Sequence, residues 1–183
     1  MLGKLAVTPI SLSLIFIAQF SFAGADPSLV QDGKSAIARI YKKVTVEQPL
    51  CFGREYSSLH LGLHPLKTVK KITARFSTEP QYNTKIMQLE LILKGEQYSY
   101  KVFKAFMVCL PESGSCHVEC DGGSVYLKSS DDDKVSVINQ GFVAQGACGE
   151  DGQDLDTIFI EAKKDGDDVF KLKRLPSEFC QTK

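Results

Sequence analysis

The feature that most constrains the fold is a two-residue alternation of apolar and polar side chains from Val69 onward. In such a pattern successive side chains point to opposite faces of a sheet, so that one face is apolar and packs against the core. The side chains expected to face inward in the first two strands are Ile72, Ala74 and Phe76, then Met87, Leu89, Leu91 and Leu93. Seven or eight short strands in succession, joined by short turns, predict an antiparallel meander.

A meander of this length must protect its edge strands. An up-and-down β-barrel of the lipocalin-like kind protects them by closure, and a β-sandwich does so by folding one sheet over the other. We favour the barrel because the connections look local throughout, and the sandwich is the alternative. The predicted fold class is therefore all-β, with a short helix near residues 57–64.

Three segments have distinctive local patterns. Tyr98–Leu110 is apolar or aromatic on both faces, which predicts the most buried strand. The apolar phase changes between Val118 and Val125, across Asp121-Gly122-Gly123, and a glycine bulge shifts the phase in this way. Asp165-Gly166 lies between the last two expected strands and predicts that they form a hairpin.

The first 25 residues have the features of a cleavable signal peptide. Lys4 supplies a positive start, Leu5 to Phe22 are largely apolar, and Ala23-Gly24-Ala25 offers the small residues that a signal peptidase accepts. A proline and a glutamine shorten the apolar run below the roughly 20 residues that a spanning helix needs, which disfavours a membrane anchor. We therefore expect a periplasmic or secreted protein without a membrane span after cleavage.

The remaining chain divides into an arm and one domain. Residues 26–36 are polar and without a period, which predicts a flexible arm, and residues 37–183 are expected to form a single disulfide-braced β domain. At the start of that domain, residues 36–46 fit either a short helix or a strand. Ile37 and Ile40 have helical spacing, whereas the end of the segment is β-branched.

An even number of cysteines in an exported chain indicates disulfides rather than a metal site. The six cysteines are Cys51, Cys109, Cys116, Cys120, Cys148 and Cys180. Fifteen pairings are possible in principle. We favour Cys109–Cys116 because a turn-like Pro111–Gly114 lies between them; Cys120–Cys148 and Cys51–Cys180 then follow. Zinc binding is disfavoured because the chain has no Cys-x-x-Cys pair.

Composition excludes several classes of function. Lys+Arg and Asp+Glu are balanced at 22 each, so no overall field attracts nucleic acid. We find no cofactor motif and no Gly-x-Ser-x-Gly elbow, and every cysteine is needed for a disulfide, so the sequence leans away from an enzyme. The favoured hypothesis is a monomeric, non-catalytic envelope module that holds a small ligand or a protein partner, since eight-stranded barrels can enclose one small ligand.

The most unusual segment runs from Cys51 to Pro65. His60 and His64 are four residues apart, a spacing that can chelate a metal on one helix face, and this is the alternative function, possibly enzymatic. The competing structural interpretation is a short helix that plugs one end of the barrel. A polar ligand site would lie around Arg54, Tyr56 and these two histidines. The strand near the glycine pair would add Glu119 and Asp121 to that site.

Four motifs resemble a group of uncharacterised exported proteobacterial proteins. The motifs are Cys51-x-Gly-Arg-x-Tyr, His60-Leu-x-x-His64-Pro65, Val118-Glu-Cys-Asp-Gly-Gly123 and Leu172-x-Arg-Leu-Pro176 followed by Cys180. The resemblance spans most of the chain after the signal peptide and implies a bacterial periplasmic or secreted protein. It implies no function, so no residue role follows from it.

Overall fold

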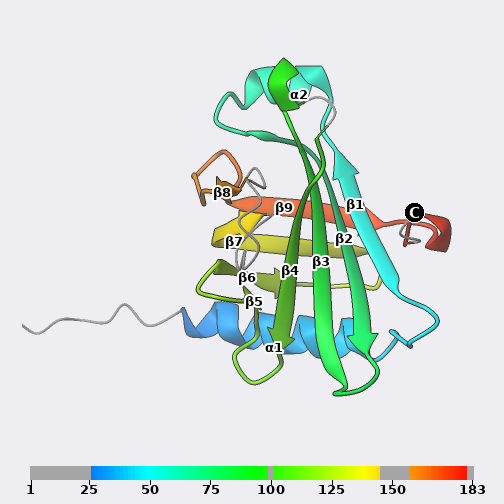
Figure 1. Cartoon of the computed structure of the whole chain (residues 1–183). Coiled ribbons are helices and arrows are strands. Elements are labelled where there is room, and N and C mark those ends of the chain that lie inside the picture. Colours follow the sequence, from blue (N-terminus) through cyan, green and yellow to red (C-terminus); the bar gives the residue numbers. More distant parts are fainter. Residues whose placement is uncertain (1–25, 99–100, 145–156, 181–183) are drawn as a thin grey trace, which may run out of the picture.

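The computed structural model describes residues 26–98, 101–144 and 157–180, without the side chains of Ser177 and Cys180. The predicted signal peptide lies outside these residues. Within them the chain forms one sheet of nine strands (Figure 1). The strands are β1 Leu50–Glu55, β2 Val69–Glu79, β3 Thr84–Leu93, β4 Phe103–Leu110, β5 Ser115–Val118, β6 Gly123–Lys128, β7 Lys134–Ala144, β8 Ile158–Ile160 and β9 Val169–Arg174.

The sheet closes on itself. Each strand from β1 to β7 pairs with the next in sequence, β7 pairs with β9, and β9 returns to β1. All of these pairings are antiparallel, and β8 is an extra strand attached to the far part of β7. Figure 1 shows β2, β3 and β4 upright in front, with β7 and β9 crossing behind them. The up-and-down barrel is therefore confirmed, and the sandwich is not formed.

Side chains fill the interior of the barrel. The inward-facing sets predicted for β2 and β3 are confirmed, because Ile72, Ala74, Phe76, Met87, Leu89 and Leu91 are fully buried and Leu93 nearly so. Four phenylalanines, Phe76, Phe103, Phe142 and Phe170, each have less than 2 % of their surface exposed. A water-sized space beside such a ring would expose it, so none of these four rings borders one. Burying each ring contributes about 1.5–3 kcal/mol.

The lower end of the barrel in Figure 1 is closed by helix α1, Pro27–Tyr41. Asp26 caps the helix, its carboxylate accepting a hydrogen bond of 2.8 Å from the Ser28 amide, and Pro27 occupies the first turn, where its missing N–H costs nothing. The flexible arm predicted over residues 26–36 is therefore wrong. Its polar residues form the outer face of a helix whose inner face buries Ile37 and Ile40.

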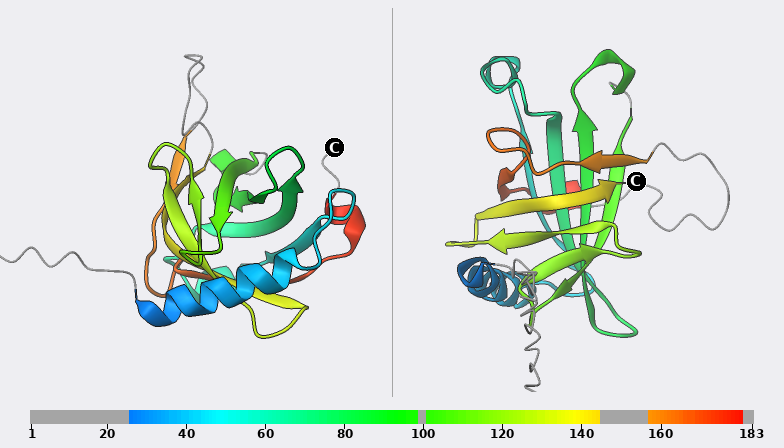
Figure 2. Two further views of the ribbon diagram at one scale, coloured as in Figure 1. Left: turned by 90° about the horizontal axis from the view of Figure 1, so that it is seen from below. Right: turned by 90° about the vertical axis from the view of Figure 1, so that its left-hand side faces the viewer.

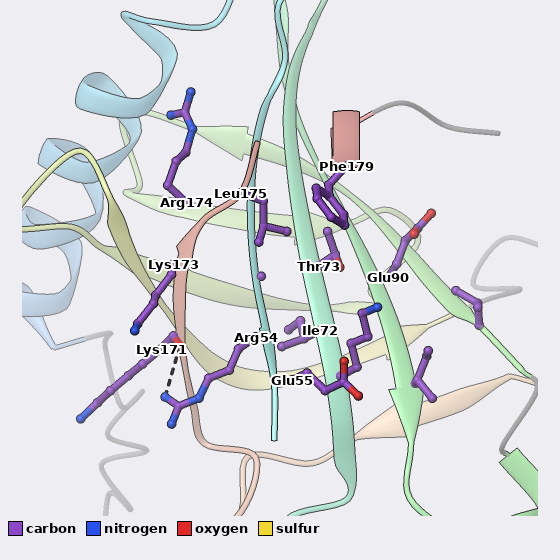
Figure 3. A pocket seen from close by; sticks show the side chains of 14 residues that line it. Arg54, Glu55, Ile72, Thr73, Glu90, Lys171, Lys173, Arg174, Leu175 and Phe179 are labelled. Atoms are coloured by element: carbon purple, nitrogen blue, oxygen red, sulfur yellow. Dashed lines mark hydrogen bonds between the residues drawn. The ribbon is translucent and has the colours of Figure 1, made fainter. Parts of the chain in front are cut away.

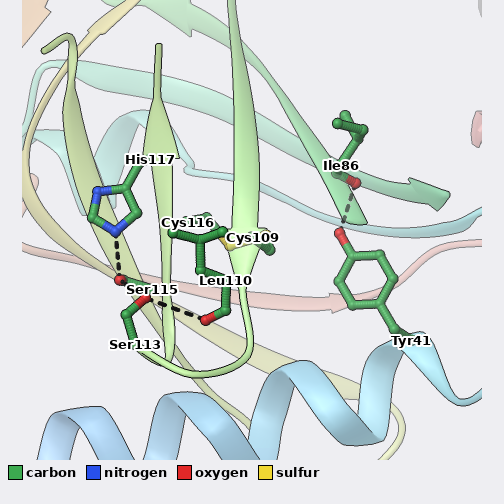
Figure 4. The surroundings of a disulfide bond; sticks show 8 residues. All are labelled: Tyr41, Ile86, Cys109, Leu110, Ser113, Ser115, Cys116 and His117. Atoms are coloured by element: carbon green, nitrogen blue, oxygen red, sulfur yellow. Dashed lines mark hydrogen bonds between the residues drawn. A yellow bond between two sulfur atoms is a disulfide. The ribbon is translucent and has the colours of Figure 1, made fainter. Parts of the chain in front are cut away.

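Helix α1 packs closely on the β4–β5 hairpin. A Cβ added to Gly33 would lie 1.8 Å from the carbonyl oxygen of Gly114, so only glycine allows this approach. Gly114 itself has a φ of +71°, which places it in the left-handed region that glycine adopts without strain. The helix ends at Tyr41, whose hydroxyl donates a hydrogen bond of 2.7 Å to the carbonyl of Ile86 (Figure 4).

The same hairpin is closed by the predicted Cys109–Cys116 disulfide, which is confirmed (Figure 4). The two cysteines are directly opposite each other on β4 and β5. Cys51 and Cys120 are disulfide-bonded as well. The predictions Cys51–Cys180 and Cys120–Cys148 depend on side chains outside the described residues.

The prediction that Tyr98–Leu110 forms the most buried strand is wrong, because β5 has a larger share of buried residues than β4. A 3-10 turn, Glu96–Tyr98, precedes β4, which begins at Phe103 and alternates between buried and exposed side chains. Phe106 faces outward and is 58 % exposed. Aromatic residues on both faces of this strand therefore do not mean burial on both faces, because one face of an eight-stranded barrel is the outside.

The glycine bulge and the last hairpin also differ from expectation. The apolar phase changes after Val118 because the chain reverses direction there. Cys120 and Asp121 have positive φ angles in the turn that joins β5 to β6. The register is irregular nearby, at Gly123, where β6 pairs with β7. Strand β8 pairs with β7 and not with β9, so Asp165-Gly166 forms a turn without a hairpin.

Candidate functional site

The upper end of the barrel carries the short helix predicted near residues 57–64. Helix α2, Ser58–Leu63, begins after Ser57, whose side-chain oxygen accepts a hydrogen bond of 3.2 Å from the His60 amide. It ends at Leu63, with His64 as its C-cap, and Pro65 follows. None of its residues is buried, so it does not plug the barrel as the structural interpretation of this segment expects. Figure 1 and the right-hand view of Figure 2 show α2 at the opposite end of the molecule from α1.

Four of the predicted site residues come together beside α2 as a stack of side chains. The ring centroids of Tyr56 and His60 are 4.9 Å apart with an interplanar angle of 21°, and those of His60 and His64 are 4.4 Å apart at 35°. The Arg54 guanidinium carbon lies 4.7 Å from the Tyr56 ring centroid. These contacts hold the four side chains in one order, and we call them the ring stack.

The surroundings of the ring stack favour the neutral forms of His60 and Tyr56. Partial desolvation lowers the pKa of His60, and the nearby His64, Arg54 and Lys67 lower it further. Burial raises the pKa of Tyr56, with a further increase from Asp167 and an opposing effect of Arg54. The Arg54 guanidinium above the face of the Tyr56 ring is attracted by the ring quadrupole.

A buried ion pair that the sequence analysis missed supports the stack from below. The Lys67 ammonium lies 3.1 Å from a carboxylate oxygen of Asp167 and donates a hydrogen bond of 2.6 Å to the Gly166 carbonyl. Asp167 also accepts from the amides of Thr68 at 2.8 Å and Val69 at 3.2 Å. The two residues are 100 positions apart, and in the sequence each looks like an ordinary exposed charge.

The two other predicted site residues, Glu119 and Asp121, lie in the turn between β5 and β6 rather than at the stack. In the described parts of the chain, no hydrogen bond, ion pair or ring contact joins either of them to the other four. Nor do those parts contain a group of three or more His, Cys, Asp or Glu side chains placed to hold a metal. The third histidine, His117, lies on β5, where its ring nitrogen is 2.7 Å from the Ser115 hydroxyl.

A groove of about 820 Å³ opens on the outer face of β1, β2 and β9 (Figure 3). Its origin is the short pairing between β1 and β9, which is limited to Phe52 opposite Arg174 and Gly53 opposite Lys173. Beyond Gly53 the two strands separate, and the Arg54 side chain bridges the gap by donating a hydrogen bond of 3.3 Å to the Lys171 carbonyl. Arg54 therefore belongs both to the ring stack and to the groove.

One part of the groove is apolar and close-fitting. After β9 the chain folds back over the outer face, where a Cβ added to Gly53 would lie 2.7 Å from the end of the Leu175 side chain. Phe179 follows in the short 3-10 turn Ser177–Cys180 and is 62 % exposed. Ile92 and Val102 extend this apolar lining from the other side.

The other part of the groove is cationic. Its lining includes five basic side chains and only two carboxylates. The basic residues are Arg54, Lys71, Lys171, Lys173 and Arg174, and the acidic ones are Glu55 and Glu90. Glu90 is also 3.5 Å from the ammonium of Lys104, so its charge is partly balanced from outside the groove. Figure 3 shows Lys171 and Lys173 on one side of β1 and Phe179 on the other.

No family model, curated protein or solved structure matches this chain. Among the described residues, no helix is both long and apolar enough to cross a membrane. The function is therefore inferred from the geometry of the groove and of the upper end.

Proposed function

We propose that the protein is a non-catalytic binding module that holds a small anionic ligand with an apolar part in the groove outside the barrel. The observation that carries this proposal is the lining of the groove, in which an apolar surface borders an excess of basic side chains. Its volume of about 820 Å³ is within the range of small-molecule sites.

The interior of the barrel is a poor alternative site. A lipocalin-like ligand would need space among the inward-facing side chains, and the four buried phenylalanines leave none beside them. A ligand there would have to displace core side chains, and interiors packed to crystal-like density resist this strongly. Binding on the outer face requires no such change.

The groove suggests how the ligand lies. Its apolar part would contact Leu175 and Phe179, whose exposed surface would be removed from water. Its anionic group would lie near the ammonium groups of Lys171 and Lys173, both of which are exposed and have no carboxylate partner in the described residues. Arg54 is held nearby by its bond to the β9 backbone and would add a planar donor that suits a carboxylate or phosphate.

The proposal is tested with dodecanoate as the probe, using isothermal titration calorimetry. We expect saturable binding of dodecanoate and none of dodecyltrimethylammonium, which has the same tail and the opposite charge. The double variant Lys171→Glu/Lys173→Glu should weaken binding by about tenfold or more, since two attractive contacts become repulsive.

The matched control is Lys42→Glu/Lys164→Glu, which changes the net charge equally at two exposed lysines outside the groove. This control should bind dodecanoate like the unaltered protein. Equal loss of affinity in both double variants, or no saturable binding by the unaltered protein, would overturn the proposal.

A further inference from the structure

The ligand groove borders a break in the backbone pairing of the barrel. Where β1 and β9 pair, Gly53 is opposite Lys173, and the pairing goes no further toward the α2 end. Two residues along each strand, Glu55 and Lys171 would form the next pair of the same kind in an antiparallel ladder. They lie on separated strands instead, and both are exposed and line the groove. One backbone pair of the barrel is therefore missing beside the groove.

The backbone groups of Glu55 point into this break. In a strand, the N–H and C=O of one residue point to one neighbouring strand and those of the next residue to the other. The Tyr56 amide donates a hydrogen bond of 2.9 Å to the Lys70 carbonyl of β2, so the groups of Glu55 point away from β2. The Cys51 carbonyl, four residues earlier, accepts a hydrogen bond of 2.8 Å from the Leu175 amide on the same side. Glu55 therefore offers a donor and an acceptor where the β9 ladder has ended.

The facing edge of β9 is held open by a side chain. The Lys171 carbonyl points into the break, where it accepts the hydrogen bond of 3.3 Å from Arg54 (Figure 3). This contact satisfies one backbone acceptor of the break and fixes a guanidinium beside the open groups of Glu55. Extended peptides bind to open strand edges of this kind, with affinity from main-chain hydrogen bonds and specificity from the side-chain surfaces nearby.

The charges of the groove indicate which part of a peptide suits it. Each of its two carboxylates has a lysine close by, since Glu55 is directly opposite Lys71 in the β1–β2 ladder and Glu90 is 3.5 Å from the ammonium of Lys104. The two exposed lysines of β9 have no carboxylate partner in the described part of the chain. Positive charge beside an open strand edge favours the one peptide group that always carries a negative charge at neutral pH, the terminal carboxylate.

We propose that the ligand of the groove is the carboxyl-terminal end of an extended peptide, which pairs through its backbone with Glu55 and ends in an apolar residue. Its terminal carboxylate lies near Arg54 and the lysines of β9, and its last side chain contacts Leu175 and Phe179. This inference rests on the proposed function and adds the class of ligand. A fatty acid supplies the same charge and apolar surface, but it has no amide groups that could pair with the open edge.

The test is isothermal titration calorimetry of the protein with the acetylated peptide TVTVL, whose carboxyl terminus is free. We expect saturable binding that is weakened by dodecanoate, because the two ligands share the groove. The same peptide with a terminal amide should bind about tenfold or more weakly, since the charge-assisted contacts of the carboxylate are lost. Equal affinity of the amide and the free peptide, or binding that dodecanoate does not affect, would overturn the proposal.

Backbone pairing is tested with two further peptides, which are methylated at the amide nitrogen of the last or of the preceding residue. Neighbouring N–H groups of an extended peptide point to opposite sides, so only one of the two methyl groups should weaken binding, by about tenfold or more. Each peptide is the control for the other, because both carry one added methyl group. Equal affinities of the two methylated peptides would contradict pairing with Glu55. Binding of dodecanoate without binding of TVTVL would overturn this inference and leave the proposed function standing, whereas binding of neither would overturn both.

Discussion

Each end of the barrel carries a helix, but only α1 closes its end by burying side chains. Helix α1 has 15 residues and buries an inner face that includes Ile37, Ile40 and Tyr41. Helix α2 has six residues and buries none fully; Leu61 packs partly against the core, while Leu59 and Leu63 face the solvent. The α1 end is closed by apolar packing, and the α2 end is held by a buried ion pair and a stack of rings.

This difference indicates that the two ends of the barrel have different roles. The α1 end contains the features expected of a structural closure, namely a capped helix, a close glycine contact and a disulfide-bonded hairpin. The α2 end combines polar side chains that are costly to bury with exposed apolar ones, and this combination gives little stability. Functional sites often depart from local stability in this manner. The α1 end therefore has the features of a structural closure, and the proposed binding site lies in the groove that adjoins the α2 end.

The largest expected effect concerns the ion pair that holds the α2 end. Lys67→Met should lower the free energy of unfolding by about 3–5 kcal/mol, because Asp167 would remain buried without its countercharge. Urea unfolding followed by circular dichroism measures this. The double variant Lys67→Met/Asp167→Asn should recover part of the loss. A change below about 1 kcal/mol in the single variant would show that the pair does not hold this end.

A pair of glycine substitutions compares the two helices directly. Gly33→Ala should destabilise the protein by about 3 kcal/mol, because the new Cβ would meet the Gly114 backbone at 1.8 Å. Gly62→Ala in α2 meets nothing within 4 Å and should be neutral or stabilising by up to about 1 kcal/mol, through helix propensity. Both are measured by urea unfolding. Similar changes in the free energy of unfolding at the two sites would contradict the conclusion that only α1 is closely packed on the barrel.

Tyr41 allows a prediction at high pH for the α1 end. Burial raises the pKa of Tyr41 far above its ordinary value, so the folded state keeps the proton where the unfolded state loses it. Stability from this group is complete below pH 10.0 and decreases as pH rises above that value. Tyr41→Phe should cost about 1 kcal/mol at neutral pH, from the lost bond to Ile86, and should make alkaline unfolding less steep. An unchanged alkaline profile would contradict this assignment.

The smallest effect is expected at the α2 end on mild acidification. The pKa of His60 is lowered in the folded state, chiefly by desolvation, so the unfolded state binds a proton first as pH falls. Stability from this group is complete above pH 6.5 and is lost as pH falls from there through the folded pKa. The melting temperature should therefore decrease slightly on acidification in the unaltered protein, and less in His60→Gln. An equal decrease in both proteins would exclude His60 as the cause.

Local patterns predicted much of the barrel. The alternation in β2 and β3 correctly predicted the inward-facing residues. A helix also lies where one was expected, with Ser57 before its first residue and Pro65 after its C-cap. The start of the chain was misjudged because the polar face of α1 looks like a loop when its partner, the hairpin at Gly114, is unknown. Strand pairing was harder to predict than strand position, because Asp165-Gly166 forms a turn whether or not the strands on either side of it pair with each other.

The candidate site was partly within reach of the sequence. Arg54, Tyr56, His60 and His64 are near neighbours along the chain, and helical spacing brought the two histidines together. The groove was not within reach, because Lys171 and Phe179 meet Gly53 and Thr73 only through barrel closure. Nor did the pattern of charges reveal the pair of Lys67 with Asp167, which depends on a contact between distant loops.

The most direct test of the proposed function is a ¹⁵N–¹H correlation spectrum recorded during titration with dodecanoate. The account predicts progressive shifts of the amide signals of Gly53, Thr73, Lys171 and Lys173, which line the outer groove, with little change at the interior residues Ala105 and Leu127. Large shifts at those interior residues, with the groove signals unmoved, would place the ligand inside the barrel and contradict the central claim.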